Sequence, residues 1–485
     1  IPNLDPTVNF YLQKGHNTSP QTSSRVTGTN FLVSQYTSSG FSYQQGFLTG
    51  TNLTFNMQSQ GLRQNSPGND FNPSTTANAY LGISQNLLQG FGLAANKRSI
   101  RIAKNNRHVA DLVFKQQVMA TVANVINLYY DLVSFNENLK VQRQALELNQ
   151  KLYEDNKRRA SLGAIAPIDI VQAEAEMTAA QQQVTDAETQ VLQQEMILKN
   201  ALTRSGPDSL SVIDARIVPT TSIVVPEKET IRPVQDLIGQ AIALRPEVEE
   251  SRVGMDNSKI SMQGTRSAAL PVLQAFATLQ NNALAGQVNT VPPVSDGSSS
   301  LLPPVSSTPN PFFLGGWGTV LGQLFSRNFP NYSAGFQLSI PIRNRAAQAD
   351  LIRDQLTLRE QQIQDRQLQN RIRMNVLNAR IALQQARAAY DTSVKARMLQ
   401  DQTLHGAQRK YQLGTSSFLD VVIVQRDMVT RRQAEVTALN SYIRARTNLE
   451  LMIGEILQNH NISIEEAYSG KVQRPPTPLP VLDQK

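Results

Sequence analysis

Side chains that commonly do chemistry in proteins are few and scattered in this sequence. Cysteine is absent, which excludes thiolate nucleophiles, thiolate metal sites and disulfide bonds. No phosphate-binding glycine loop, nucleophile elbow or HExxH zinc motif occurs. The four histidines lie far apart in the sequence, at His16, His108, His405 and His460. The sequence therefore predicts that the chain is not an enzyme and that it holds neither a metal nor a cofactor.

Two carboxylates stand out because they occupy the same place in a repeated motif. The motifs Leu162–Asp169 and Leu413–Asp420 lie 251 positions apart, and each has Leu-Gly followed by an Asp six positions after the glycine. One interpretation of Asp169 and Asp420 is helix capping, because Ser417–Asp420 fits a capping box.

Long helices must position these motifs. Two segments without proline precede them, from about Asn96 to Ala160 and from about Ala346 to Gln412. Apolar residues recur at steps of three and four in the second segment, at Leu368, Ile372, Val376, Ala379, Leu383, Ala386, Tyr390 and Val394. After the motifs they recur every seven positions, at Met177, Val184, Val191, Leu198, Val422, Val429, Val436 and Ile443. Each motif is therefore predicted to join two antiparallel helices, with Gly163 and Gly414 left-handed at the helix ends.

Six shorter segments alternate apolar and polar residues, as strands do. They are Thr7–Gln13, Phe41–Phe47, Asn52–Gln58, Ala79–Leu87, Val272–Gln280 and Ser333–Ile340. Such strands, separated by long polar loops, indicate a membrane β-barrel. The hairpin that turns at Thr49–Thr51 either joins this barrel or lies outside it. Aromatic residues of the long loop form either a girdle or plug near the outer leaflet or the core of a folded external loop: Phe312, Phe313, Trp317, Phe325 and Phe329.

The charge balance leaves two kinds of partner to consider. The chain has 46 Lys+Arg against 38 Asp+Glu, a net charge of +8 and a pI near 9.6, which suits nucleic acid or an anionic membrane surface. No run of eighteen apolar residues occurs, so we expect no transmembrane helix. A soluble coiled-coil structural or nucleic-acid-binding protein is the alternative to a membrane duct, and the alternating strands argue against it.

Four stretches of the sequence resemble the TolC family, the outer-membrane factors of bacterial tripartite efflux and secretion systems. They are the strand-to-helix junctions Leu87–Gly92 and Leu338–Arg345, the helix start Ala243–Val248 and the hairpin tip Tyr411–Val422. The resemblance implies a homotrimer, mainly α with β, in the bacterial outer membrane. Two strand pairs per chain would share a β-barrel, and helical hairpins would continue it as an α-helical barrel in the periplasm.

The implied function is a passive exit duct for small molecules or peptides. Its implied partners are a periplasmic adaptor, an inner-membrane RND or ABC pump and outer-membrane lipid, but not nucleic acid. Asp169 and Asp420 would narrow the periplasmic mouth, and Tyr411 would help to latch it. The first repeat has Ala160 in place of Tyr411, so one tyrosine per chain can act as a latch.

The tips of the hairpins would contact the adaptor. The residues expected to make this contact are Leu162, Gly163, Leu413, Gly414, Thr415 and Ser416. Four basic residues precede the tips, where they suit the negative ends of the helix dipoles or, alternatively, grip the adaptor: Arg158, Arg159, Arg409 and Lys410.

The duplicated plan predicts the domain organisation. A first repeat covers 1–203, with strands in 1–95 and a helical hairpin in 96–203, and an equatorial linker follows in 204–233. A second repeat covers 234–456, with a helix in 234–266, strands in 271–342 and a hairpin in 346–456. An equatorial segment and a Pro-rich tail cover 457–485. The helix 234–266 has no counterpart in the first repeat. We therefore expect a signal peptide and one more helix upstream in the natural precursor.

Overall fold

The computed structural model describes residues 4–163, 165–203, 213–221, 223, 225–227, 232–292 and 309–471. The Pro-rich tail, much of the linker 204–233 and the loop 293–308 lie outside the described residues. The chain divides into two compact units, Ile1–Arg107 with Gly254–Gln361 and His108–Val253 with Gln362–Lys485. Each unit takes segments from both of the expected repeats.

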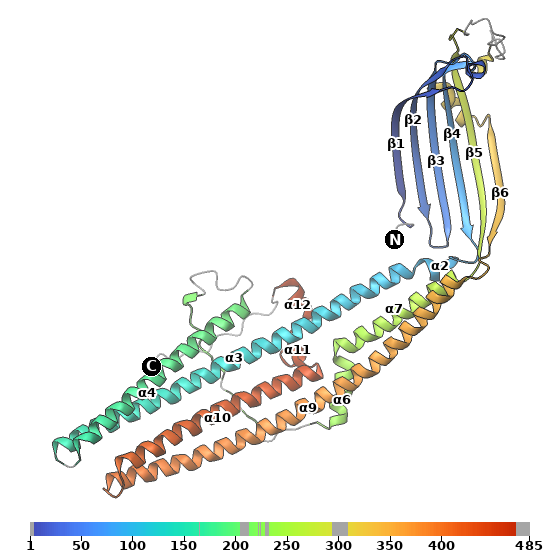
Figure 1. The fold of residues 1–485 in the computed structure, drawn as a ribbon. Coiled ribbons are helices and arrows are strands. Elements are labelled where there is room, and N and C mark those ends of the chain that lie inside the picture. Colours follow the sequence, from blue (N-terminus) through green and yellow to red (C-terminus); the bar gives the residue numbers. More distant parts are fainter. Residues whose placement is uncertain are drawn as a thin grey trace. The chain divides into compact units, whose positions relative to one another are not determined.

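The first unit is built on one antiparallel sheet, whose strands lie side by side in sequence order (Figure 1). The strands are β1 (Thr7–Pro20), β2 (Phe31–Gly46), β3 (Thr51–Gln64), β4 (Phe71–Asn86), β5 (Val272–Val288) and β6 (Pro330–Ser339). All six expected strands are confirmed, and each is longer than expected. The hairpin that turns at Thr49–Thr51 is β2–β3, and it belongs to the sheet. This decides the alternative that the sequence left open, because the described residues form six strands, two more than the two strand pairs that the resemblance implies.

Short helices accompany the sheet. They are α1 (Ser24–Thr27), α2 (Gly92–Asn96), the 3-10 helix η1 (Pro311–Phe313) and α8 (Trp317–Phe325). Gly92 begins α2 with φ of 85°, a left-handed conformation that favours glycine where the chain turns from β4 into the helices.

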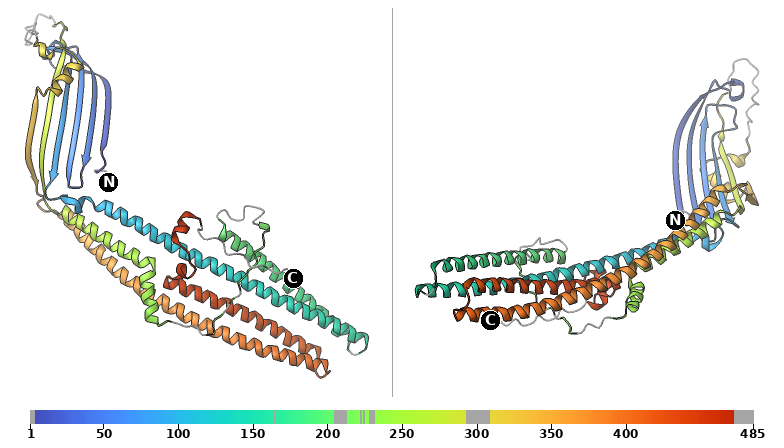
Figure 2. Two further views of the ribbon diagram at one scale, coloured as in Figure 1. Left: turned by 180° about the vertical axis from the view of Figure 1, so that it is seen from behind. Right: turned by 60° about the horizontal axis from the view of Figure 1, so that its bottom comes forward.

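Long helices make up most of the second unit, and three of them, α3, α7 and α9, pass from one unit into the other. The helices are α3 (Arg98–Ser161), α4 (Pro167–Leu202), α6 (Val234–Leu244), α7 (Pro246–Ala268), α9 (Arg345–Gln412) and α10 (Phe418–Ile453). The two expected hairpins, α3–α4 and α9–α10, are confirmed, and they lie side by side in the second unit (Figure 2).

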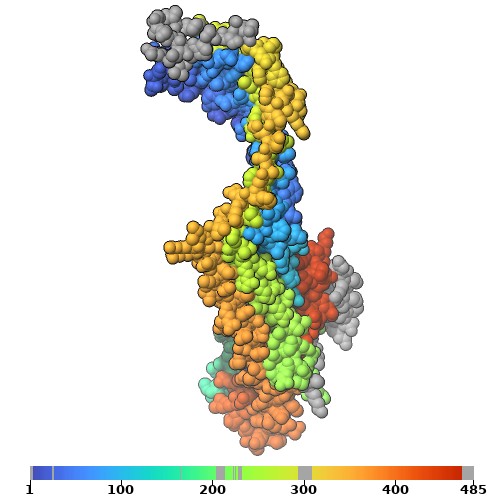
Figure 3. Space-filling model, turned by 90° about the vertical axis from the view of Figure 1, so that its right-hand side faces the viewer, coloured from blue at the N-terminus to red at the C-terminus, as the bar shows by residue number. Residues whose placement is uncertain are grey.

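The single helix expected over 234–266 is two helices, α6 and α7. The break falls at Arg245, whose φ and ψ of −73° and 126° are extended. Pro246 causes the break, because its ring disfavours the helical conformation of the preceding residue. Beyond the break α7 runs beside α9 (Figure 3), where Ser251 donates a hydrogen bond to Asp365 at 2.9 Å.

Apolar contacts hold the α3–α4 hairpin together, and both polar and apolar contacts join the two hairpins. The α3–α4 hairpin is packed through Leu132, Leu139, Val184, Ala187, Val191 and Leu198. The polar contacts between α3 and α10 are hydrogen bonds and an ion pair. Asp131 accepts from Asn440 at 2.7 Å and pairs with Arg444 at 2.6 Å, and Asn149 accepts from Gln425 at 2.6 Å. Side chains that make such polar contacts can exchange partners with little loss of buried apolar area.

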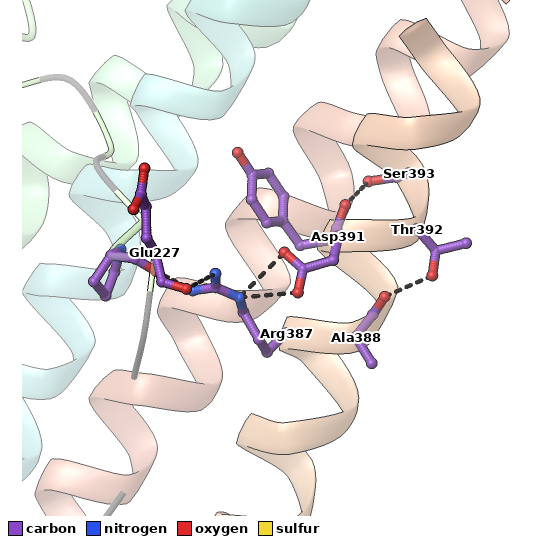
Figure 4. Close-up of polar contacts among 8 residues, drawn as sticks. Glu227, Arg387, Ala388, Asp391, Thr392 and Ser393 are labelled. Carbon is purple, nitrogen blue, oxygen red and sulfur yellow. Dashed lines mark hydrogen bonds and ion pairs between the residues drawn. The ribbon is translucent and has the colours of Figure 1, made fainter. Parts of the chain in front are cut away.

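Two short helices and the linker pack on the long helices. Helices α11 (Ile456–Asn459) and α12 (Ile464–Ser469) follow α10, and Ile456 is fully buried beside Met119 of α3. The linker passes Arg387 of α9, whose guanidinium bonds both oxygens of Asp391 at 3.2 Å and donates to the backbone carbonyl of Glu227 at 3.4 Å (Figure 4).

One helix does not fit the expectation that none is apolar enough to cross a membrane. By length and composition α3 qualifies, because one of its eighteen-residue windows has a mean hydropathy of 1.3. The sequence expectation counted uninterrupted apolar residues, whereas the mean hydropathy averages over intervening polar ones. In the structure α3 packs against α4 and α11, as a helix of a bundle does.

Candidate functional site: a two-faced sheet and two helical tips

One face of the sheet is apolar across all six strands. Alternate residues of a strand point to the same face, and the antiparallel register aligns these residues between neighbouring strands. In this way Phe10, Phe41, Met57 and Ala79 share a face. The other large apolar residues on this face include Val8, Leu12, Leu53, Phe55, Leu81, Ile83, Leu273, Leu279, Phe336 and Leu338. Many of them are exposed, Phe10 at 71% and Phe336 at 75%, so the face is not covered within one chain.

The opposite face is polar but carries no charge. Amide and hydroxyl side chains fill it, including Asn9, Gln13, Ser42, Asn56, Gln58, Asn78, Gln280, Asn282, Ser333 and Gln337. No Asp or Glu occurs in any of the six strands. This pattern of one apolar and one polar face is that of a membrane barrel wall, with lipid outside and water inside.

Aromatic rings on the polar face lie against glycines of the neighbouring strand. A Cβ atom built on Gly40 would come within 2.2 Å of the Tyr11 ring, and one built on Gly15 equally close to the Tyr36 ring. The glycines leave space for these rings to lie along the sheet. The tyrosine rings on the polar face therefore lie flat along the sheet and project little from it.

Both edges of the sheet are unpaired in one chain. The strand β6 is exposed along nearly its whole length and β1 along most of it. Leu12 on one edge is 68% exposed, and Tyr332 on the other is 83% exposed. Unpaired edge strands with exposed apolar side chains template pairing with another chain.

The second site consists of the two hairpin tips. Both predicted glycines are left-handed, with φ of 73° at Gly163 and 74° at Gly414, and they end α3 and α9. The next helices begin differently. In α10 the Ser417 hydroxyl accepts from the Asp420 amide at 3.2 Å, and the Asp420 carboxylate accepts from the Ser417 amide at 3.0 Å. The capping-box interpretation is therefore confirmed for Asp420.

The first tip has no such cap. Ala166 precedes α4 and has no side chain that can accept a hydrogen bond. Asp169 lies in the first turn of α4, half-buried, and no described residue forms a side-chain hydrogen bond with it. The two carboxylates that the sequence makes equivalent thus differ, since Asp420 is committed to a helix cap and Asp169 is not.

Tyr411 joins the two hairpins near the tips. Its hydroxyl donates to Asn156 Oδ1 of α3 at 2.6 Å, and the Arg159 guanidinium lies 4.5 Å from its ring centroid. Asn156 is fully buried, and Tyr411 is 8% exposed. Burial raises the pKa of the Tyr411 phenol above its ordinary value, against the smaller opposing effect of Arg159.

Tyr411 is also part of an apolar cluster that draws on all four long helices. The cluster comprises Ala173, Tyr411, Phe418, Val421 and Val422, with Leu152 and Tyr153 packed against it. Beside it Arg426 of α10 forms a two-pronged ion pair with Glu176 of α4. Tyr411 therefore connects α9 to α3 within one chain, and its role as a latch stays a prediction.

The predicted adaptor contacts are mainly exposed. Leu162 is 82% exposed and Leu413 is 79% exposed, so each tip presents a leucine to the surroundings. The basic residues divide: Arg158 pairs with Asp155 at 2.7 Å, whereas Arg159 faces Tyr411. Arg409 and Lys410 lie in the last turn of α9, where they suit the dipole.

Sequence reasoning missed three residues that tie the tips together: Asn156, Glu176 and Arg426. Their partners lie about 250 positions away, and none belongs to the repeated motif. Only the side-by-side packing of the hairpins brings them together. Among the described residues no group of His, Asp or Glu is arranged to hold a metal ion.

A sheet with an apolar and an uncharged polar face, joined to long helical hairpins, defines an outer-membrane channel. Family comparison agrees, since a model of the outer membrane efflux protein family matches residues 45–204 and 237–455. The chain belongs to this family. Family membership supports a transport channel rather than an enzyme, and it leaves the nucleic-acid-binding alternative without support.

Solved structures of outer-membrane channels share the fold. The CmeC channel of Campylobacter jejuni is 15% identical with a TM-score of 0.59, over 93% of this chain and 78% of that one. VceC of Vibrio cholerae is 14% identical with a TM-score of 0.59, over 92% and 87%. The open state of the MtrE channel of Neisseria gonorrhoeae is 16% identical with a TM-score of 0.54, over 94% and 82%. No curated protein matches the chain.

Proposed function

We propose that three copies of the chain close their sheets into one barrel that serves as the exit duct of a tripartite efflux or secretion system. The observation that carries this proposal is the six-stranded sheet with two open edges. An even number of strands makes β1 of one copy antiparallel to β6 of the next, as closure requires. Three copies of six strands make a barrel of eighteen.

The proposed barrel conducts passively. Barrels of about 16 to 18 strands are wide enough to leave an aqueous channel. The polar face that would line it offers amide and hydroxyl groups and no fixed charge. Such a wall holds water without binding one charge type, so the cargo of small molecules or peptides would be selected by the pump rather than by the barrel.

The proposed gate lies at the hairpin tips. The Tyr411–Asn156 hydrogen bond and the Arg426–Glu176 ion pair hold the two hairpins of a chain together there. Opening would break these contacts and part the apolar cluster around Tyr411, while the packing between α3 and α4 persists. Asp169 and Asp420 would ring the mouth in the trimer and favour cations.

The proposed partners meet the tips. The exposed Leu162 and Leu413 offer apolar contacts to a periplasmic adaptor, and Arg409 and Lys410 offer charges. The adaptor would connect the duct to an inner-membrane RND or ABC pump. A pull on the tips would then act directly on Tyr411, which lies in the same last turn of α9 as Arg409 and Lys410.

Cross-linking tests the barrel directly, because a chain without cysteine is a clean background. Asn9→Cys in β1 is combined with a cysteine at Asn331, Ser333 or Gln337 in β6, all on the polar face. Oxidation of the protein in mild detergent should give covalent dimers and trimers for at least one pair, with a native mass of three copies. The same sample should form channels in a planar bilayer.

A matched control pairs Asn9→Cys with Asn56→Cys, which lies inside the sheet on β3. This pair should give no cross-link between chains. A monomer in detergent, with no cross-link from any β6 position and no conductance, would exclude the shared barrel.

A further inference from the structure

The segment Pro311–Phe325, which forms η1 and α8, is an apolar helix without charge. No Lys, Arg, Asp or Glu occurs from Asn310 to Ser326, and Arg327 is the first charged residue beyond it. The segment lies near the end of the sheet away from Asn86 and Ser339, where the strands continue into the helices.

Helix α8 lies on the apolar face of the sheet. Val320 and Leu324 are buried against the small side chains Ala77, Ala283 and Ala285. Ala77 points to the same face as Leu81, four residues further along β4, because side chains alternate along a strand. The helix is therefore on the outside of the proposed barrel rather than in its lumen.

The same segment and the residues after it cover the part of β5 that extends beyond β6. Strand β6 pairs with β5 only as far as Asn281, and β5 continues to Val288. Along this remainder the Asn282 amide donates to the Phe329 carbonyl at 3.2 Å, and the Leu284 amide donates to Gln323 Oε1 at 3.0 Å. Gln323 is only 4% exposed. Pairing every backbone group in this way is what hydrocarbon demands and water does not.

The outward side of α8 is also apolar. Gly318, Gly322 and Phe325 lie on this side, and Phe325 is 81% exposed. Trp317 begins the helix on the stripe of Leu324 and is still 48% exposed. A helix that is apolar all round belongs in a protein core or a membrane. Since one side already packs on the sheet, the other requires lipid, and Trp and aromatic residues concentrate where the acyl chains meet the headgroups.

Basic residues lie on the same face toward the same end of the strands. Lys14 and Arg63 are the only Lys or Arg residues in the six strands, and both are exposed. The register places His16 and Arg63 on either side of Gln35. Positive side chains beside an apolar band match the phosphate groups of lipids.

We propose that η1 and α8 form an in-plane anchor in the outer-leaflet interface, with Lys14, His16 and Arg63 facing phosphate-bearing lipid headgroups. The proposal rests on the proposed function, which makes the apolar face of the sheet the lipid-facing one. It assigns Trp317 and Phe325 to the lipid side, whereas the rings of Phe312, Phe313 and Phe329 pack on one another within the folded loop.

Trp317 is the only tryptophan in the chain, so its fluorescence reports on α8 without any substitution. The trimer is reconstituted in phosphatidylcholine vesicles with phosphatidylglycerol. Lipids brominated near the top of the acyl chain should remove most of the emission, lipids brominated near the chain end should remove less, and aqueous iodide should remove little. Strong iodide quenching without lipid quenching would overturn the anchor.

Two control variants in a Trp317→Phe background separate this inference from the barrel itself. Phe55→Trp on the apolar face should be quenched by deep bromine, and Tyr80→Trp on the polar face should be quenched by iodide. If both controls behave so and Trp317 does not, the anchor fails and the barrel stands. If Phe55→Trp also escapes lipid quenching, the proposed function fails.

The basic residues are tested by thermal unfolding in mixed micelles. Adding phosphatidylglycerol should raise the melting temperature of the native trimer more than phosphatidylcholine does, and the Lys14→Gln, Arg63→Gln variant should lose this difference. Inorganic phosphate alone should not replace the lipid. An unchanged phosphatidylglycerol effect in the variant would contradict the headgroup contact.

Discussion

The tip between α3 and α4 and the tip between α9 and α10 follow the same plan, with a left-handed glycine, an exposed leucine and an acidic residue in the next helix. They differ in how they are held. The second tip has a capping box at Ser417 and Asp420, a further bond from Ser416 to Asp420 at 2.9 Å, and Tyr411. The first tip has Ala166 and Pro167 at the start of its helix and no tyrosine.

This difference indicates a division of roles. The second tip is stiffened by its own hydrogen bonds and fastened to the first hairpin by Tyr411. The first tip has fewer internal bonds, and Asp169 has no hydrogen-bonding partner among the described side chains. We therefore expect the second tip to move as a unit and the first to deform when the hairpins separate.

Removing the Tyr411 side chain should produce the largest change in stability at the hairpin tips. Tyr411→Ala deletes a buried ring and its bond to Asn156, a loss of about 3 kcal/mol in local stability. Amide exchange around Asn156 and in the first turn of α10 should rise about a hundredfold, as hydrogen–deuterium exchange can measure. In a planar bilayer the channel should open more readily.

Tyr390→Ala provides the control, because Tyr390 lies on the same helix away from the tip and is half-buried. It should leave exchange at the tips unchanged. Equal effects of the two substitutions would mean that Tyr411 contributes general helix packing and is not a latch.

Replacing each aspartate should have a smaller effect on amide exchange than Tyr411→Ala, and the effect should differ between the two tips. Asp420→Ala removes the carboxylate half of the capping box and leaves the Ser417 hydroxyl in place, so exchange in the first turn of α10 should rise severalfold. Asp169→Ala removes only a dipole contact of about 0.3 kcal/mol, so the first turn of α4 should change by less than about twofold.

Conductance gives the second measurement on these two variants. If both carboxylates ring the mouth, each variant should raise the conductance and weaken the preference for cations. Unchanged currents from both would remove the gate role of the aspartates and leave the duct intact.

The pH should affect the cap and the latch at opposite ends of the scale, with the smallest changes near neutrality. Hydrogen bonds from the Ser417 side chain and backbone and from Ser416 hold the pKa of the Asp420 carboxyl below its ordinary value. The cap is therefore fully present above the unfolded pKa of about 3.9 and is lost as the pH falls through the lower folded pKa. The pKa of Tyr411 is raised, so its bond is fully present below about pH 10 and is lost at higher pH.

Exchange of α10 measured at several pH values, after correction for the intrinsic rate, tests both limits. Asp420→Asn should remove the acid dependence, and Tyr411→Phe should remove the alkaline one. An acid transition that survives in Asp420→Asn would show that another carboxylate controls the tip.

Much of the fold could be predicted because it depends on local patterns. Alternation in segments such as Asn52–Gln58 identified the strands, and periods of three, four and seven identified the long helices. The segment 234–266 was predicted as one helix, although the helix start predicted at Ala243–Val248 coincides with the break that Pro246 causes at Arg245. The sequence left open whether the β2–β3 hairpin joins the other four strands, because pairing between strands of neighbouring hairpins is not a local property.

By itself the sequence determined the hairpin tips, the two-faced strands and the capping box at Ser417, because each depends on residues close together in the chain. The tertiary structure alone decided which side chains fasten the hairpins, since Tyr411 and Asn156 are 255 positions apart. It also decided the place of Trp317. Its helix is apolar on both sides, so no local pattern in the sequence indicates which face of the sheet the helix covers. Local periodicity determines which surfaces must be buried, whereas packing decides what buries them.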